Sequence, residues 1–310
     1  MPDDGALARV IARAHQRAAR YRRFLPDERP PIADWARRVD EFQERTMQEM
    51  LWRASWNRPG GTPVLFIPGI RLNGEGRTRL GRLLQRAALV PLSWSVPVWL
   101  LRRDLLLRSG FTRERPVSLE TIADEAAVAI SQQFGSAIDV VGESTGGSIA
   151  LLLAARHPDI VRRLVVVSSA ARMSDAGQEA QKLAVRALRN GRFTAAAVRM
   201  LVTGIRWPAH APLTRLAAWF VGVAVTTESA RDAADLMEAE DGYDLRTELD
   251  RIRARTLLVG GSRDGFYPPD LIDETARLIP SADSVILLRR GHLSATAGHR
   301  VRSQIRRQLR

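Results

Sequence analysis

The sequence contains no cysteine, and Lys182 is its only lysine. The absence of cysteine excludes a disulfide-stabilised scaffold and cysteine-ligated metal sites. The H-E-x-x-H metal motif, the G-x-x-x-x-G-K-[ST] phosphate-binding motif and the G-x-G-x-x-G dinucleotide motif are all missing. No two histidines have metal-ligand spacing on one helix. We therefore expect a protein that uses no metal and no other cofactor.

Long apolar runs are also missing, and none reaches the roughly 18 residues that span a bilayer. Near the N-terminus, apolar residues recur at helical spacing between arginines, whereas a signal peptide needs an unbroken apolar core of at least about 7 residues. This pattern predicts an amphipathic helix that packs on the rest of the protein. Peripheral contact with an anionic membrane is the alternative that it leaves open. We expect a cytoplasmic protein without a transmembrane segment.

Acidic residues are scarcer than basic ones, 34 against 47, which gives a formal net charge of +13. Such a surplus raises the question of a nucleic-acid partner. The arginines are spread along the chain in short pairs, and no recognisable nucleic-acid module interleaves them with stacking aromatics. We therefore expect no specific nucleic-acid partner. The 45% hydrophobic and 26% charged residues are typical of an ordinary globular protein.

The most informative motif is G-E-S-T-G at 142–146, whose central residue is Ser144. It follows the run 138–141, which is apolar apart from Asp139, and precedes a helical pattern over 148–156. A strand, a sharp turn and a helix are the context in which G-x-S-x-G forms a nucleophile elbow. The flanking residues must be small, because the serine adopts a strained backbone conformation of positive φ next to the adjacent strand and helix. The motif predicts an exposed, nucleophilic serine hydroxyl.

An acid and a histidine follow the serine in the order that this chemistry requires. The segment 255–264 is a short apolar strand that ends in a turn at Asp264. A further strand over 284–288 leads into the loop that carries His292. Functional groups of open parallel sheets gather at the carboxyl ends of the strands. We therefore predict that Ser144, Asp264 and His292 lie close together.

Three other residues compete for these roles. His299 opens the arginine-rich terminal helix, whereas the glycine before His292 and the strand behind it suit a catalytic loop. Asp270 and Asp273 follow two prolines and are predicted to form the cap and the first turn of a helix. We therefore favour His292 as the base and Asp264 as the acid.

These motifs resemble the α/β-hydrolase superfamily, in its serine-nucleophile branch with a lid. The segment V-L-F-I-P-G-I at 64–70 is similar to the strand and turn that carry the family's oxyanion loop. The stretch 140–147 is similar to its nucleophile elbow, and 260–268 to its acid turn. The resemblance implies a mostly parallel central sheet flanked by helices, which is the α/β-hydrolase fold.

The resemblance also implies a division of the chain. Residues 45–172 and 246–310 would form the hydrolase core. Residues 173–245 would form a helical lid, inserted before the strand that bears the acid. Residues 1–44 would be a helical extension packed on the core, and the segment 46–56 is predicted to contain an early strand of the sheet.

Roles in catalysis follow from the resemblance residue by residue. Ser144 would attack an acyl carbonyl, His292 would move its proton, and Asp264 would orient the histidine. Arg71, beside the oxyanion loop, and Glu143, beside the nucleophile, are candidate substrate contacts. An arginine at such a position suits a carboxylate group.

The oxyanion hole would come from two backbone N–H groups, those of Ile70 and Thr145. The chain departs from the family in this loop. Family members usually have a histidine before the loop glycine, where this chain has Pro68. A proline side chain donates no hydrogen bond, so the loop must be held in another way.

The sequence therefore predicts a serine hydrolase that cleaves a carboxylic ester through an acyl-enzyme intermediate. Its substrate is expected to be a small acyl compound, and the apolar run 216–225 in the lid favours an apolar one. A serine at the elbow argues against the epoxide and haloalkane branches, which the resemblance associates with an aspartate there. An acyltransferase on the same triad and a non-catalytic ligand-binding protein of the same fold are the alternatives left open.

Overall fold

The computed structural model describes residues 51–53, 61–70, 96–102, 118–205, 211–223, 225–296 and 298–309. The predicted N-terminal extension, 1–44, lies outside these residues, as does Arg71. Of the early strand predicted within 46–56, the structure describes β1, Leu51–Arg53.

Strands of the described part form one sheet of seven, in the order β1-β3-β2-β4-β5-β6-β7. The antiparallel pair is β1 with β3, and the other neighbours are parallel. The strands after β1 are β2 (Val64–Ile67), β3 (Val98–Leu101), β4 (Ile138–Glu143), β5 (Val161–Val167), β6 (Arg255–Gly261) and β7 (Ala282–Leu287). This mostly parallel sheet confirms the predicted fold class.

The central strands are apolar on both faces because helices cover both sides of the sheet. On one face, Leu65, Val140 and Leu258 belong to a core cluster that also contains the buried side of α5, α6 and α11. On the other face, Val64 and Val259 pack with α13. The bounds of these helices are α5 Leu119–Phe134, α6 Thr145–Arg156, α11 Pro269–Leu278 and α13 His299–Gln308. The alternation of side chains along each strand therefore supplies two cores.

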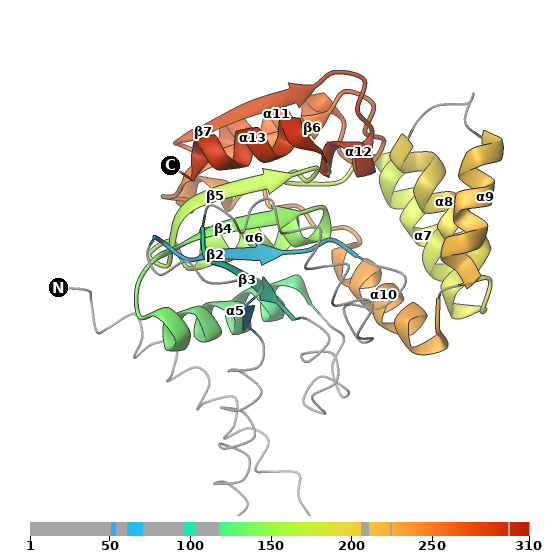
Figure 1. Ribbon diagram of the computed structural model, residues 1–310, viewed down its shortest axis with the longest axis horizontal. Coiled ribbons are helices and arrows are strands. Elements are labelled where there is room, and N and C mark those ends of the chain that lie inside the picture. Colours follow the sequence, from blue (N-terminus) through green and yellow to red (C-terminus); the bar gives the residue numbers. More distant parts are fainter. Residues whose placement is uncertain are drawn as a thin grey trace, which may run out of the picture.

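Between β5 and β6 the chain forms a group of helices that lies beyond the tips of β2, β4 and β5 (Figure 1). The group consists of α7 (Asp175–Arg189), α8 (Phe193–Ile205), α9 (Ala211–Val223) and α10 (Thr227–Glu240). Helices α7, α8 and α10 share a cluster of their own, which includes Ala184, Ala196, Ala234 and Met237. They occupy the stretch predicted as the lid; the function of a lid stays a prediction.

Two shorter elements complete the described part. A 3-10 helix, η3 (Leu249–Arg251), leads into β6, and α12 (His292–Thr296) follows β7. Helix α11 begins at Pro269, with Asp270 in its first turn and Pro268 at its N-cap position. The two aspartates therefore lie in this helix, but Asp270 rather than Asp273 occupies its first turn. The predicted aspartate cap is wrong, because a proline occupies that position.

Candidate active site

Ser144 stands at the junction between β4 and α6 in a strained conformation, with φ 53° and ψ −131°. Its backbone N–H donates to Val167 O at 2.9 Å, and its carbonyl accepts from the N–H of Gly147 at 2.6 Å. Non-glycine residues seldom adopt positive φ, and such strain persists only where the surroundings hold it in place. The strained turn predicted at this serine is therefore present.

The glycines around Ser144 are required by close contacts. A Cβ on Gly146 would collide with the carbonyl oxygens of Ile67 and Pro68, which belong to β2 and the loop after it. A Cβ on Gly69 would lie 2.8 Å from Ser144 Cβ. The loop after β2 therefore presses directly against the serine, and only glycine allows that approach.

His292 and Asp264 lie beside the serine and form a continuous hydrogen-bonded chain with it. His292 Nε2 is 2.9 Å from Ser144 Oγ, and His292 Nδ1 is 2.8 Å from Asp264 Oδ2. An ionised carboxylate can only accept, so Nδ1 donates to it and Nε2 is left to accept from the hydroxyl. The other oxygen of Asp264 accepts from the backbone N–H groups of Phe266 and Tyr267, at 2.9 and 3.1 Å. The three predicted residues are thus brought together from the ends of three strands.

The charge of Asp264 sets the protonation of the histidine. Burial of the ring acts to lower the pKa of His292, but the charge of Asp264 and its hydrogen bond outweigh that effect, so the pKa lies above its usual value. The charge of Glu143, at the end of β4, acts in the same direction. Asp264 itself is fully buried. The site therefore favours a proton on His292 whenever the serine gives one up.

Backbone strain is concentrated around this chain of hydrogen bonds. The positive-φ residues other than glycine among the described residues are Ser144, Ser168 (φ 49°) and Arg289 (φ 60°). Ser168 follows β5, and its hydroxyl donates to the carbonyl of His292 at 3.3 Å. Arg289 turns the chain three residues before His292, and its N–H donates to Ser262 Oγ at 2.8 Å. Strain of this kind is common at functional sites, where the surrounding structure holds it.

The two residues predicted to form the oxyanion hole both lie near the serine. Thr145 follows it in the chain, and Ile70 lies in the loop after β2 that abuts it. Thr145 is the first residue of α6, and the first N–H groups of a helix have no acceptor within it. Ile70 follows the glycine that abuts Ser144, and its side chain packs against both the sheet core and the α7–α10 cluster. This packing anchors the loop on both sides. It is one way of holding a loop that has Pro68 at the position where the family usually has a histidine.

The residues that competed with His292 and Asp264 in the sequence lie away from Ser144. His299 begins α13, while Asp270 and Asp273 lie in α11. Asp273 accepts a hydrogen bond from Ser284 at 2.7 Å on the exposed surface. Arg290, two residues before His292, has an exposed side chain. None of these four side chains is hydrogen-bonded to Ser144 or His292.

Sequence reasoning missed a buried carboxyl group behind the elbow. Glu240, the last residue of α10, is 1% exposed and accepts from three hydroxyls. The donors are Thr145 Oγ1 at 2.6 Å, Ser148 Oγ at 2.9 Å and Tyr267 OH at 3.0 Å. Burial raises the pKa of Glu240 above its usual range, while these three hydrogen bonds act to lower it. No sequence signal marked this residue, because nothing in an amphipathic helix tells which distant hydroxyls its end will meet.

Aromatic rings pack against the histidine, and these also went unpredicted. The ring of Tyr267 is stacked on His292 with centroids 5.9 Å apart and an interplanar angle of 27°. Phe266 meets the same ring edge-on at 5.1 Å. Helix α8 covers this group, since a Cβ on Gly204 would lie 3.2 Å from His292 Cβ. The histidine is consequently held between the acid turn and the helical segment.

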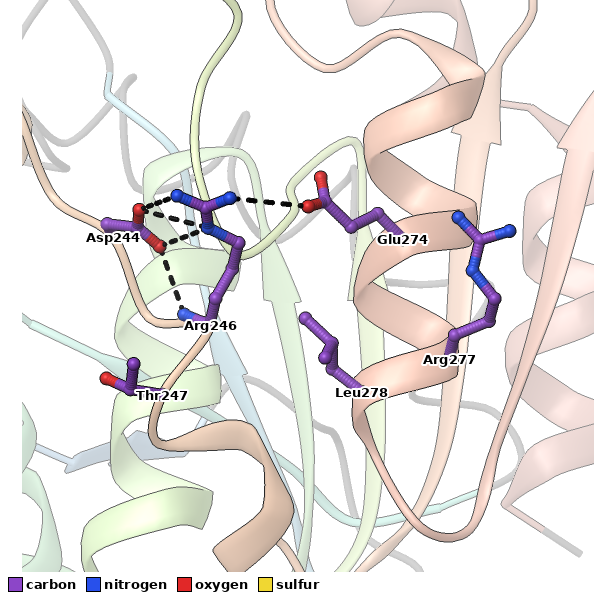
Figure 2. A pocket seen from close by; sticks show the side chains of 6 residues that line it. All are labelled: Asp244, Arg246, Thr247, Glu274, Arg277 and Leu278. Carbon is purple, nitrogen blue, oxygen red and sulfur yellow. Dashed lines mark hydrogen bonds and ion pairs between the residues drawn. The ribbon is translucent and has the colours of Figure 1, made fainter.

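A hollow of about 410 Å³ lies elsewhere on the surface, and Figure 2 shows its walls. It is lined by Asp244, Arg246, Thr247, Glu274, Arg277 and Leu278. Figure 2 shows Arg246 between Asp244 and Glu274, with ion pairs of 2.6 and 3.6 Å. The positive charge of Arg246 is thus already matched by two carboxylates. Because none of the predicted catalytic residues lines the hollow, we do not assign it to the reaction.

Comparison with known proteins identifies the family of the chain. The family model for the alpha/beta hydrolase fold matches residues 115–295, which is more than half of the chain. The chain therefore belongs to the α/β-hydrolase family. It is 30% identical over 228 residues to a pimeloyl-[acyl-carrier protein] methyl ester esterase of Neisseria meningitidis serogroup C, a match that covers 71% of this chain and 83% of that one.

Solved structures of low sequence identity share the fold. An alpha/beta hydrolase enzyme from a Medee basin deep-sea metagenome library matches with a TM-score of 0.66 and 15% identity, over 84% of this chain and 91% of that one. The enol-lactonase from Burkholderia xenovorans matches with a TM-score of 0.59 and 21% identity, over 79% and 89% of the two chains. The protein is accordingly an α/β hydrolase, and it has an esterase among its relatives.

None of the helices in the described ranges combines the length and the apolar character that a bilayer crossing requires.

Proposed function

We propose that this protein is a serine hydrolase that cleaves a carboxylic ester through a covalent acyl-enzyme. The observation that carries the proposal is the unbroken chain from Ser144 Oγ to His292 and on to Asp264, with both links shorter than 3.0 Å. Such a chain makes the serine nucleophilic because the histidine takes up its proton as the bond to carbon forms.

The reaction would run in two halves. Ser144 Oγ attacks the ester carbonyl carbon while its proton passes to His292 Nε2, and the carbonyl oxygen becomes an oxyanion. The backbone N–H groups of Thr145 and Ile70 would stabilise that oxyanion. His292 then protonates the departing alcohol, which leaves an acyl group on the serine. A water molecule then gives a proton to His292 while its oxygen attacks the acyl carbon. The bond between that carbon and Ser144 Oγ breaks, His292 returns the proton to Ser144 Oγ, and the acid leaves the enzyme in its starting state.

The esterase relative supports an ester with a small alcohol, because its name describes the removal of a methyl ester. The helical segment α7–α10 would act as a lid over the site. Its support is the contact of α8 with His292 and the side chain of Ile70, which joins the oxyanion loop to that segment. The lid would shield the acyl-enzyme and set the size of the acyl group accepted.

A fluorophosphonate probe tests the proposal directly, because it labels only an activated serine. The wild type is expected to gain one adduct, mapped by peptide mass to Ser144, and to hydrolyse methyl esters of graded acyl length. Ser144→Ala and His292→Ala are expected to lose the adduct, with a fall in kcat on the order of 10⁴-fold or more. A folded wild type that neither labels nor turns over esters would overturn the proposal and point to a ligand-binding protein.

Hydrolysis and acyl transfer are separated by the same enzyme in a second assay. With an ester substrate and increasing concentrations of an alcohol or an amine, a hydrolase is expected to keep releasing the free acid as its main product. Product that passes mainly to the added acceptor would identify an acyltransferase instead.

A further inference from the structure

Glu240 has surroundings that a surface-helix residue would not need. It ends α10, is 1% exposed, and takes its hydrogen bonds from residues far away in the chain. A carboxyl group withdrawn from water is costly unless its oxygens are well bonded, and here three hydroxyl groups bond them. Two of the donors, Thr145 and Ser148, lie in the first turn of α6, and the third, Tyr267, lies in the turn after β6.

These donors lie in both turns of the proposed catalytic site, the turn that carries Ser144 and the turn that carries Asp264. Thr145 directly follows the nucleophile, and its N–H is a proposed oxyanion donor. Tyr267 donates its backbone N–H to Asp264 at 3.1 Å, and its ring is stacked on His292. A single carboxyl group therefore bonds the turn that carries the nucleophile and the turn that carries the acid.

We propose that Glu240 is a positioning residue, which holds Thr145 and Tyr267 in the arrangement that the oxyanion hole and the histidine require. The inference rests on the proposed function, since positioning has a meaning only if Ser144 reacts. Glu240 touches neither the substrate nor the reacting atoms, and it acts through its hydrogen bonds. Through Glu240, the helical segment α7–α10 is hydrogen-bonded to the two turns that carry Ser144 and Asp264.

The conservative variant distinguishes bonding from mere packing. A glutamine at position 240 has nearly the same shape, and its carbonyl can accept from Thr145 while its amide N–H donates to a hydroxyl. Hydroxyls both donate and accept, so the network can persist with its bond directions changed. Alanine removes every bond. Loss of alignment of this kind can cost about 10²-fold in rate.

The experiment compares the wild type with Glu240→Ala and Glu240→Gln in two assays, fluorophosphonate labelling of Ser144 and steady-state ester hydrolysis. Glu240→Ala is expected to lower both the labelling rate and kcat by about 10- to 100-fold, with KM within about threefold of the wild type. Glu240→Gln is expected to stay within about threefold of the wild type in both. A folded Glu240→Ala protein with unchanged rates, or a Glu240→Gln protein as slow as the alanine variant, would overturn the inference.

A second pair of variants keeps the test decisive if Glu240→Ala does not fold. Thr145→Val removes one hydroxyl of the network and preserves the side-chain shape, so a fall in kcat is expected. Its matched control is Thr275→Val, since Thr275 is also a buried threonine and accepts from Ala171 N at 2.8 Å, away from the site. The control should lose thermal stability but keep its kcat. Equal kcat values for the two threonine variants would contradict the positioning role.

Failure of this inference is distinguishable from failure of the proposed function. If the wild type itself is not labelled at Ser144, the proposed function falls. If the wild type is labelled and the variants at 240 and 145 react at the same rate as the wild type, only the role of Glu240 falls.

Discussion

The sheet core and the helical segment α7–α10 bury different kinds of side chain. Most buried positions of the sheet are filled by valine, leucine and isoleucine, and those of β2, β4 and β5 are at most 9% exposed. The helical segment is held mainly by alanines, with Leu188 and Met237 among the few larger side chains. Several of its large apolar side chains face outwards instead, such as Trp219 at 52% and Phe220 at 61% exposed.

This difference separates two tasks. Each buried methylene contributes roughly 0.8 kcal/mol, so a core of branched side chains holds its geometry more strongly than a cluster of alanines. The serine, the acid and the histidine are attached to the stronger region. The helical segment contacts the turns that carry them through residues such as Gly204, Glu240 and Ser174, the N-cap residue of α7. The hydrogen-bonded chain is therefore built on the sheet core, and the helical segment supports it from one side through Glu240.

The largest expected effect is on the chemistry, from Asp264→Asn. The charge and hydrogen bond of Asp264 hold the pKa of His292 above its usual value of about 6.5. Activity of the wild type should therefore fall as the pH drops through a pKa above that value, because a protonated histidine cannot act as a base. The variant is expected to lose about 10⁴-fold in kcat and to shift the acidic limb of kcat/KM to lower pH. If the acidic limb of kcat/KM lies at the same pH in both proteins, a group other than His292 determines its position.

The next effect is on stability, in the sheet core. Leu258 lies in β6 and is fully buried, so Leu258→Ala should lower the free energy of unfolding by about 2–5 kcal/mol through the cavity it leaves. Urea unfolding measured by circular dichroism gives the value. A loss below about 1 kcal/mol would mean that the strand repacks easily and that the contrast between the regions is weaker than its burial indicates.

The smallest effect is expected from the same substitution in the helical segment. Leu216 lies in α9 and is 54% exposed, so Leu216→Ala should change the free energy of unfolding by no more than about 0.5 kcal/mol. The identical residue types make the pair with Leu258 a matched comparison. If Leu216→Ala costs as much as Leu258→Ala, the exposed face of α9 is covered in solution. Light scattering, which measures the oligomeric state, would then show whether a second copy of the chain covers it.

Much of the fold could be predicted because its signals are local. The apolar runs that became β2, β4 and β6 are strands largely buried on both faces, and such strands read as mostly apolar segments. The elbow was equally readable, because a positive-φ serine between a strand and a helix demands small neighbours within two residues. Asp264 and His292 could be placed by their position after strands. Their hydrogen bonds with one another could be expected but not measured from the pattern.

The unpredicted parts depend on contacts between distant segments. Glu240 lies 95 residues from Thr145 and 27 from Tyr267 along the chain, and no periodicity shows that α10 ends behind the elbow. The stacking of Tyr267 on His292 is of the same kind. The cap of α11 was mispredicted for a local reason, since Pro268 takes the extended conformation of an N-cap without offering a side-chain acceptor.

The amino-acid sequence by itself therefore determined the fold class, the strained turn at Ser144 and the order of serine, acid and histidine. Each of these depends on backbone conformation and burial over a few consecutive residues. Only the tertiary structure decided which hydroxyls meet Glu240, which rings pack on His292 and where the oxyanion loop is anchored. Such contacts depend on how whole helices pack against the sheet, and packing is a property of the complete chain.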